Sequence, residues 1–241
     1  TLVVTQSANL GASTNISISN ASLQANADLT LQNVALTGTA NVLTNDALTI
    51  DGVVSGSGAL VKKGSGNLVL NGQANNTYSG GTVLESGTLT LANGNSLGLG
   101  ALTVQNGQVA LKDGFVSTQA LIQNSDNATN ITGKGTFSSA TVTNGVLTIS
   151  GDITTTNTNV DNGTLFVNGS LSSPITVGST GKLAGAGTIT GNVAVNGLLS
   201  PGNSPAILTI NGDVDQKAGS SLLVEIDGSE VPIMDGSSKP F

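Results

Sequence analysis

The sequence contains no cysteine, histidine, arginine or tryptophan, and aromatic residues make up only 2% of its 241 positions. Without cysteine there is no disulfide, no thiol nucleophile and no thiolate metal site. Without histidine there is neither a Ser-His-Asp triad nor a histidine metal centre. We therefore expect a protein that is not an enzyme, with no catalytic, cofactor-binding or metal-binding residues and no cofactor.

Charge is also scarce. Charged residues are 9% of the chain, against about a quarter in typical proteins, and the net charge is −7. Binding to nucleic acid requires clustered Lys or Arg, so an acidic chain with seven lysines is not expected to bind it. No run of 18 apolar residues predicts a transmembrane helix. The chain opens on the β-like run TLVV with no basic-then-apolar leader, which suggests a segment cut from a larger precursor.

Short alternating apolar runs are abundant. The stretch from Gly58 to Leu91 is the clearest example, with three runs around Val69, Val83 and Thr90 that are separated by Gly- and Asn-containing turns. Alternation of apolar and polar residues over a few positions predicts half-buried strands. The supply of Leu, Val, Ile, Ala and Thr suits pleated sheet, and the regular alternation argues against disorder.

The same pattern recurs along the chain. Taking the residue two places after each turn Gly (or its substitute) gives anchors spaced by about 20 residues: Leu29, Leu48, Leu68, Leu89, Val109, Ala128, Leu147, Leu165, Leu183 and Leu199. Ala128 is placed by spacing alone. A second series lies out of phase with the first: Gly56–Gly58, Gly98–Gly100, Gly133–Gly135 and Gly185–Gly187, followed by Leu60, Leu102, Phe137 and Ile189.

Two or three short strands per period of about 20 residues describe one coil of a β-solenoid. We predict an all-β, single-stranded, right-handed parallel β-helix of about 10–12 coils of roughly 18–21 residues, which would form a rod on the order of 50 Å long. The competing fold is an antiparallel sandwich, which also has evenly spaced short strands. The steady period favours the solenoid.

The stretch from Gly58 to Leu91 resembles the autotransporter-associated β-strand repeat, whose members read approximately L-x-K-x-G-x-G-x-L-x-L-x-G-x-x-x-Y-x-G-x-T. The matching positions are Leu60, Lys62, Gly64, Gly66, Leu68, Leu70, Gly72, Tyr78, Gly80 or Gly81, and Thr82. The identities keep their order all the way from Leu60 to Thr82, so the resemblance is specific.

A second resemblance covers Gly181 to Glu225, which looks like the C-terminal passenger segment of autotransporters with its P-G-x-S-x-G-x-L-x-[IV] signature. Pro201, Gly202, Ser204, Leu208 and Ile210 fit, whereas Ala206 replaces the usual Gly. We expect three parts: a β-helical stem at 1–180 with its best repeat at 58–91, a C-terminal cap that resembles an autochaperone at 181–228, and a frayed tail at 229–241.

These resemblances imply a type V secreted passenger of a Gram-negative bacterium, exported through the periplasm and outer membrane to the cell surface or released. They imply that the same precursor carries a C-terminal outer-membrane β-barrel, while this segment does not itself insert in the membrane. The expected function is that of an adhesin or virulence factor whose outer faces contact host cells, extracellular matrix or other copies of itself. The alternatives are an inert stalk that carries an N-terminal enzyme domain such as a protease, and a released toxin or host-receptor ligand.

Some residues invite a chemical role. Asp213 with Asp215, and Glu225 with Asp227, lie two apart and could form acidic pairs as in β-helical polysaccharide enzymes, but an exposed acidic rim at the cap is the favoured interpretation. Calcium binding at these pairs shows no ligand-loop motif. Tyr78, the single tyrosine, is expected to pack over the turn at Gly80–Gly81 rather than to bind a ligand.

Two glycine motifs are weaker still. Gly185–Gly187 suggests a dinucleotide fingerprint, but position 190 is Thr and no helix is predicted to follow, so turn glycines are expected there. Lys182 after Gly181 lacks the remaining residues of a P-loop.

Overall fold

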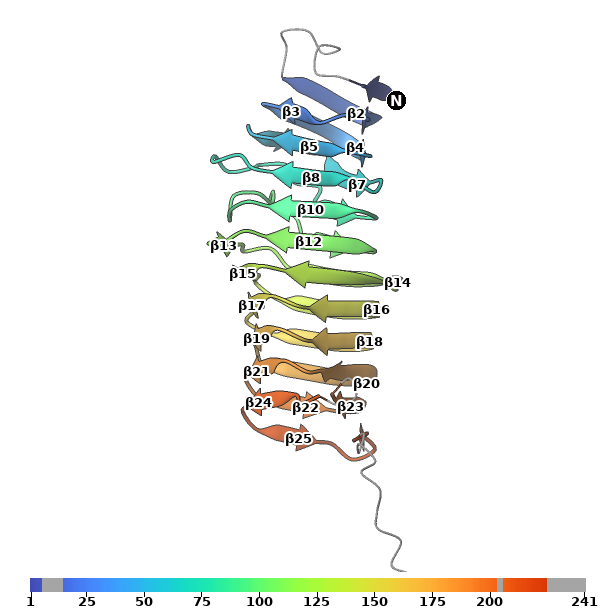
Figure 1. Ribbon diagram of the computed structural model, residues 1–241, viewed down its shortest axis with the longest axis vertical. Coiled ribbons are helices and arrows are strands. Elements are labelled where there is room, and N and C mark those ends of the chain that lie inside the picture. Colours follow the sequence, from blue (N-terminus) through green and yellow to red (C-terminus); the bar gives the residue numbers. More distant parts are fainter. Residues whose placement is uncertain (6–14, 203–205, 225–241) are drawn as a thin grey trace, which may run out of the picture.

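The computed structural model describes residues 1–5, 15–202 and 206–224. In these residues the chain forms 26 strands that wind around one axis in about 11 coils, with no helix. The chain descends the stack as a right-handed coil, because the front strands run right to left while the coils progress downward (Figure 1). The predicted β-solenoid is confirmed.

Each complete coil contributes to up to three faces. The first face is built by β1 (Leu2–Val4), β2 (Ile16–Ala25), β4 (Val34–Thr44), β7 (Ala59–Lys63), β9 (Thr82–Leu84), β11 (Leu102–Val104), β14 (Leu121–Thr132), β16 (Ala140–Ile149), β18 (Thr158–Val167), β20 (Ile175–Gly185), β22 (Val193–Val195) and β25 (Val214–Gln216). The second face is built by β3 (Leu29–Leu31), β5 (Ala47–Ile50), β8 (Asn67–Leu70), β10 (Thr88–Leu91), β12 (Gly107–Leu111), the second halves of β14, β16, β18 and β20, and then β23 (Leu198–Pro201) and β26 (Ser221–Leu222).

The third face changes character along the rod. Near the N-terminus, β6 (Val54–Gly56) pairs with the first half of β4, which pairs with the first half of β2. Toward the C-terminus a separate six-stranded sheet takes over: β13 (Phe115–Val116), β15 (Lys134–Thr136), β17 (Asp152–Thr154), β19 (Ser170–Ser172), β21 (Thr188–Thr190) and β24 (Thr209–Asn211). Between the two, residues 71–81 and 92–101 form loops without named strands.

All strand pairs among the described residues are parallel, and the single antiparallel contact is an isolated bridge between Gly185 and Gly202. This pairing excludes the antiparallel sandwich. On the first face the shortest coil runs from Val160 to Val177 and the longest from Lys62 to Leu84, close to the predicted length. The boundary expected between residues 180 and 181 falls inside β20, and pairing continues into β26.

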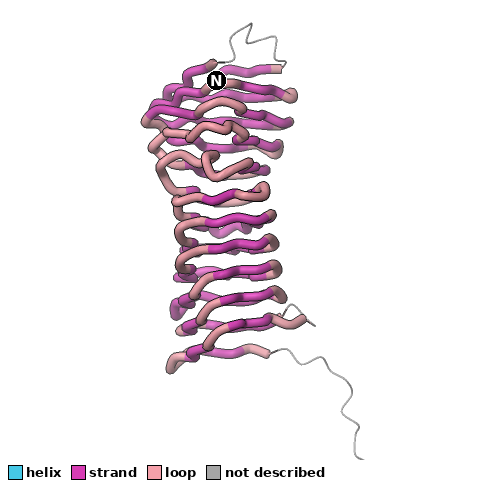
Figure 2. Tube along the Cα trace, turned by 90° about the vertical axis from the view of Figure 1, so that its left-hand side faces the viewer, coloured by secondary structure: helices cyan, strands magenta, loops and turns pink. Residues whose placement is uncertain are grey.

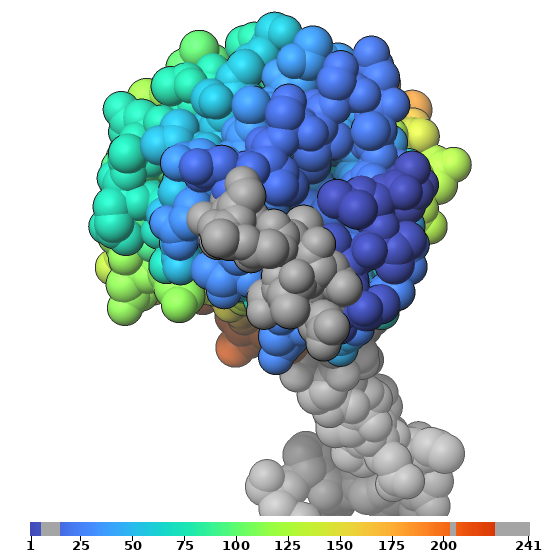
Figure 3. All heavy atoms as spheres, turned by 90° about the horizontal axis from the view of Figure 1, so that it is seen from above, coloured from blue at the N-terminus to red at the C-terminus, as the bar shows by residue number. Residues whose placement is uncertain are grey.

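The core consists of stacked Leu, Val and Ile side chains, because successive coils bring equivalent inward positions into line. On the second face, Leu29, Leu48, Leu68 and Leu89 follow one another in register, as the anchor series predicts. Burying each such side chain contributes about 1.5–3 kcal/mol. Seen along the axis, the first coils have a compact outline (Figure 3).

The anchor at Ala128 is wrong. Ala128 is exposed, and Val109 pairs with Ile131 while Leu147 pairs with Thr129. The anchors up to Val109 therefore stack on Ile131, and the anchors from Leu147 onward stack on Thr129. These two inward positions lie two residues apart on β14. Because side chains alternate with period two, a shift by two positions keeps the apolar side chains inside and leaves no trace in the pattern.

The second glycine series also mixes two places in the coil. Leu60 and Leu102 lie on the first face, whereas Ile189 lies on the third. A Gly-x-Gly turn precedes a strand at either corner, so the motif alone does not identify the face.

Candidate functional site

The motif residues of the 60–91 repeat point into the rod. Lys62 is fully buried at an inward position of the first face that Val42 and Leu84 occupy in the neighbouring coils. Its ammonium donates to three backbone carbonyls, those of Lys63 and Gly64 at 2.9 Å and that of Ser86 at 3.0 Å. Three N–H donors thus meet three acceptors, and the side chain ties its own turn to the turn of the next coil.

Burial lowers the pKa of Lys62 from 10.5 to about 8. The adjacent Lys63 is partly exposed and forms an ion pair with Glu85 at 3.1 Å. Neighbouring lysines thus face opposite ways, as alternation along a strand requires.

Tyr78 is also buried, and its hydroxyl lies 2.5 Å from the hydroxyl of Thr82, itself an inward residue. Its ring lies against Gly98 of the next coil, where a Cβ would come within 2.9 Å of the ring. Burial raises the pKa of Tyr78, an effect that hydrogen bonds with Thr82 and the Gly98 backbone partly offset. The expectation that Tyr78 packs rather than binds agrees with this burial, although the ring contact is with Gly98.

Asn76 adds side-chain hydrogen bonds to the backbone bonds that join the coils in the same part of the rod. Its side-chain oxygen accepts from the backbone N–H of Val54, and its amide nitrogen donates to the carbonyl of Ser96, both at 2.7 Å. One buried amide thus joins three successive coils where the third face has no regular strand. Lys62 and Tyr78 of the motif, together with the neighbouring Asn76, form a set of buried hydrogen bonds between coils that we call the internal frame.

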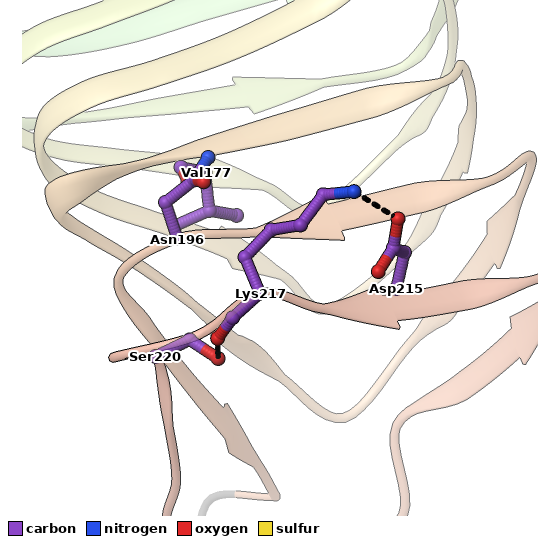
Figure 4. Close-up of polar contacts among 5 residues, drawn as sticks. All are labelled: Val177, Asn196, Asp215, Lys217 and Ser220. Carbon is purple, nitrogen blue, oxygen red and sulfur yellow. Dashed lines mark hydrogen bonds and ion pairs between the residues drawn. The ribbon is translucent and has the colours of Figure 1, made fainter.

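Other sequence candidates lie on the surface. Asp213 and Asp215 are exposed, and the Asp215 carboxylate pairs with Lys217 rather than with a second acid (Figure 4). Ser220 donates to the Lys217 carbonyl at 2.7 Å in the same coil. Glu225–Asp227 lies outside the described residues, as does Ser204 of the passenger signature. Within the described ranges, no group of three His, Cys, Asp or Glu could hold a metal ion.

Neither glycine motif forms a nucleotide-binding site: Gly185 lies in a turn, and Lys182 packs against a neighbouring ring. Gly185 has a positive φ of 126° at the end of β20, which a turn glycine adopts without cost. Lys182 extends over the ring of Phe166 with its ammonium 6.0 Å from the ring centre. Neither residue lies at a phosphate-binding loop followed by a helix.

The outer surface has a hollowed region that the sequence did not predict. On the third face, a groove of about 400 Å³ runs over β13, β15, β17 and β19 and reaches β21, and a second hollow of about 290 Å³ adjoins it, with Val116 lining both. We call the two together the third-face groove. This side faces the viewer in Figure 2. The loops at 71–81 and 92–101 project on the same side, where teal and green atoms extend beyond the first coils in Figure 3.

The sequence alone does not indicate this groove, because its exposed apolar residues resemble core residues. Val116 and Leu99 are 63% and 67% exposed, yet each sits in a short run of a kind that elsewhere supplies core residues. No helix within residues 1–5, 15–202 and 206–224 has the length and apolar character to cross a membrane.

A parallel β-solenoid whose motif residues form an internal frame is a rod-like scaffold. The side chains that remain available to contact other molecules lie on its outer surface. Comparison with known proteins indicates which kind of rod-like scaffold this chain resembles. The passenger-associated-transport-repeat family matches residues 60–91. The "Adhesin BmaC autotransporter" of Brucella suis biovar 1 (strain 1330) is 41% identical over 95 residues, which cover 38% of this chain and 3% of that protein. No solved structure matches the chain.

Both matches support an autotransporter passenger that carries this repeat, as the resemblance of residues 58–91 implied. A passenger of this kind is a cell-surface or secreted protein of a Gram-negative bacterium. The chain spans only a small fraction of the length of the curated relative that it matches.

Proposed function

We propose that this rod is a non-enzymatic adhesin passenger that contacts host cells, extracellular matrix or other copies of itself through its outer faces. The observation that carries the proposal is the 41% identity to an autotransporter named as an adhesin. The inward orientation of Lys62 and Tyr78 supports the non-enzymatic role. These two polar motif residues form hydrogen bonds inside the rod and are not available to a substrate. The sequence also lacks the histidine and cysteine on which most hydrolytic centres depend.

Within this proposal the precursor's outer-membrane barrel is the export partner, and residues 181–228 act as a C-terminal cap that folds early and templates the stem. The support is physical: an open solenoid end exposes unpaired backbone and apolar core, so a terminal coil must form before others can stack on it. Truncation to 1–180 should leave a chain that trypsin degrades rapidly. Cooperative unfolding of 1–180 at the same denaturant midpoint as the full chain would contradict this role.

A second function, that of a stalk displaying another domain, is favoured by the internal frame itself, since a rigid spacer requires only coil-to-coil cohesion. Under this alternative the rod would bind nothing of its own.

Binding separates the two. The purified full chain is labelled at its N-terminus and incubated with epithelial cells, immobilised matrix proteins and itself at micromolar concentration. Saturable binding to any of these supports the adhesin. Binding no higher than that of an unrelated β-solenoid control at all three supports the stalk.

A further inference from the structure

The third-face groove combines two kinds of surface along one line. At its N-terminal end lie Leu99 and Val116, which are 67% and 63% exposed. The other large apolar side chains found exposed in the described part of the chain belong to its two ends: Leu2, Val3, Ile207, Val214, Leu222, Leu223 and Val224. An exposed apolar pair in the middle of a rod, at a hollow, is a feature that folding alone does not require.

Beyond Val116 the groove is lined with hydroxyl groups. Thr136, Thr154, Ser172 and Thr190 follow one another in register on four successive coils and point outward. Within the described structure, none of these four hydroxyls has a hydrogen-bond partner in the protein. They form a straight rank of free donors and acceptors that repeats at the strand spacing of about 4.8 Å.

This rank differs from the ladders of outward side chains at the corners of the rod. Elsewhere, many outward polar side chains bind one another across coils: Asn162 donates to Asn144 at 2.7 Å, and Asn144 donates to Asp126 at 2.8 Å. Those corner ladders satisfy themselves, whereas the hydroxyl rank leaves its hydrogen-bonding capacity for water or a ligand.

The charge of the groove is balanced. Lys134 and Asp152 are register partners on adjacent coils and both line it. One cation beside one anion, on a chain of net charge −7, does not attract a polyanion. An extended peptide along the rod axis is also disfavoured, because β15, β17, β19 and β21 are each paired on both sides, which leaves only the end strands β13 and β24 for β-augmentation.

We propose that the third-face groove binds an extended, uncharged, equatorially linked glycan that lies along the rod axis. Such a chain carries hydroxyls on its edges and C–H groups on its ring faces, and it advances per sugar by roughly the rise of one coil. Each coil could then engage one sugar through Thr136, Thr154, Ser172 or Thr190, while Leu99 and Val116 cover a ring face at one end. This inference rests on the proposed adhesin function and gives it a ligand class.

The test titrates the full chain with chitohexaose and cellohexaose, followed by heteronuclear NMR or calorimetry. Chitobiose measures the dependence on length, hyaluronan serves as a polyanion, and an unstructured Gly/Ser-rich peptide serves as a non-glycan polymer. We expect binding of a neutral hexamer that is tighter than binding of the dimer. The double variant T154V/S172A should bind about tenfold more weakly, because two hydrogen bonds are lost.

The matched control is T176V, which removes an outward exposed hydroxyl on the first face and should change the affinity less than about twofold. V116T tests the apolar end separately and should also weaken binding. Thermal unfolding of each variant shows whether it folds as the parent does.

No binding of either neutral hexamer, equal affinity in T154V/S172A and the parent, or preference for hyaluronan or the peptide would overturn the inference. If T154V/S172A loses glycan binding but still binds cells, the groove is a glycan site and the proposed adhesin function rests on another face. If the parent binds neutral glycan but no cell or matrix, the proposed function fails while the groove assignment stands.

Discussion

Lys62 and Gln123 occupy the same inward position of the first face, three coils apart, and both use it to hold the turn that follows. The positions are linked through Leu84 and Val104, each in register with the next. Lys62 donates to the carbonyl of Gly64 at 2.9 Å, and the Gln123 amide donates to the carbonyl of Ser125 at 3.1 Å. A long polar side chain inside an apolar ladder is thus a recurrent device for satisfying corner carbonyls.

Replacing Lys62 by Ala should destabilise the fold by about 2–4 kcal/mol, because a buried stem is lost and three carbonyls lose their donor. K62Q should recover part of this loss, by analogy with Gln123. The matched control is K63A, which removes a partly exposed ion pair with Glu85 and should cost less than about 1 kcal/mol. Urea unfolding followed by circular dichroism measures all three. Equal losses for K62A and K63A would show that Lys62 does not hold the turn.

The lowered pKa of Lys62 makes stability depend on pH. Between about pH 8 and pH 10.5 the unfolded chain keeps the Lys62 proton while the folded chain releases it, so stability rises with pH in this window. Below pH 8 both states are protonated and the cost of burying the charge is fully present. Since one pKa unit corresponds to about 1.4 kcal/mol, the rise is at most about 3.5 kcal/mol.

The variant K62M isolates this effect. The difference in unfolding free energy between the parent and K62M, measured at intervals from pH 7 to pH 10.5, should shift in favour of the parent. Tyr78 acts in the opposite direction above pH 10, because its raised pKa favours the protonated folded state, but it contributes equally to both proteins. A difference that stays constant with pH would contradict the assignment.

Tyr78 and Thr82 should behave as a coupled pair. Y78F leaves the buried Thr82 hydroxyl without its partner at 2.5 Å, and T82V does the same to the tyrosine, so each should cost about 1–2 kcal/mol. The double variant Y78F/T82V removes both polar groups and should cost less than the sum of the two. A double-mutant cycle by chemical denaturation measures the coupling. Strict additivity would mean that the two hydroxyls do not interact.

The corner ladder at Asn144 should be sensitive to charge. N144D places a carboxylate beside Asp126, where the amide now donates at 2.8 Å, and should cost about 1 kcal/mol at neutral pH. The new carboxyl should have a raised pKa, so the lost stability should return as pH falls and the group is protonated. N159D, on an outward position of the first face, serves as the control. Thermal unfolding at pH 4 and pH 7 distinguishes the two variants, and a pH-independent loss in N144D would contradict the ladder.

Much of the architecture could be predicted from the sequence because inward Leu and Val recur at the coil period. Leu29, Leu48, Leu68 and Leu89 stack as the spacing indicates. The shift near Ala128 could not be predicted, since a step by two positions preserves the inside-outside pattern.

The candidate site was less accessible to sequence reasoning. The motif carrying Lys62 and Tyr78 indicated the secretion class through its resemblance, but their three-dimensional contacts explain why those residue types are there. The third-face groove depends on which Thr and Ser residues align on successive coils and on the exposure of Leu99 and Val116. The alignment and the exposure both depend on the conformation of the turns between faces, which varies from coil to coil. Short apolar runs of the same kind elsewhere in the chain are buried, so the sequence pattern does not distinguish them.

The coil register determines both the internal frame and the hydroxyl rank, because it decides which residues of successive coils stack. The chain has no cysteine, so pairs can be introduced without interference. Thr154 and Ser172 are register partners on adjacent coils, whereas Thr154 and Thr190 are two coils apart. Adjacent strands lie about 4.8 Å apart, within the Cα range for a disulfide, and strands two coils apart lie beyond about 7 Å. Under mild oxidation T154C/S172C should form an intramolecular disulfide quantitatively, while T154C/T190C should stay reduced. The reverse result, or efficient crosslinking of both pairs, would contradict the stacked solenoid.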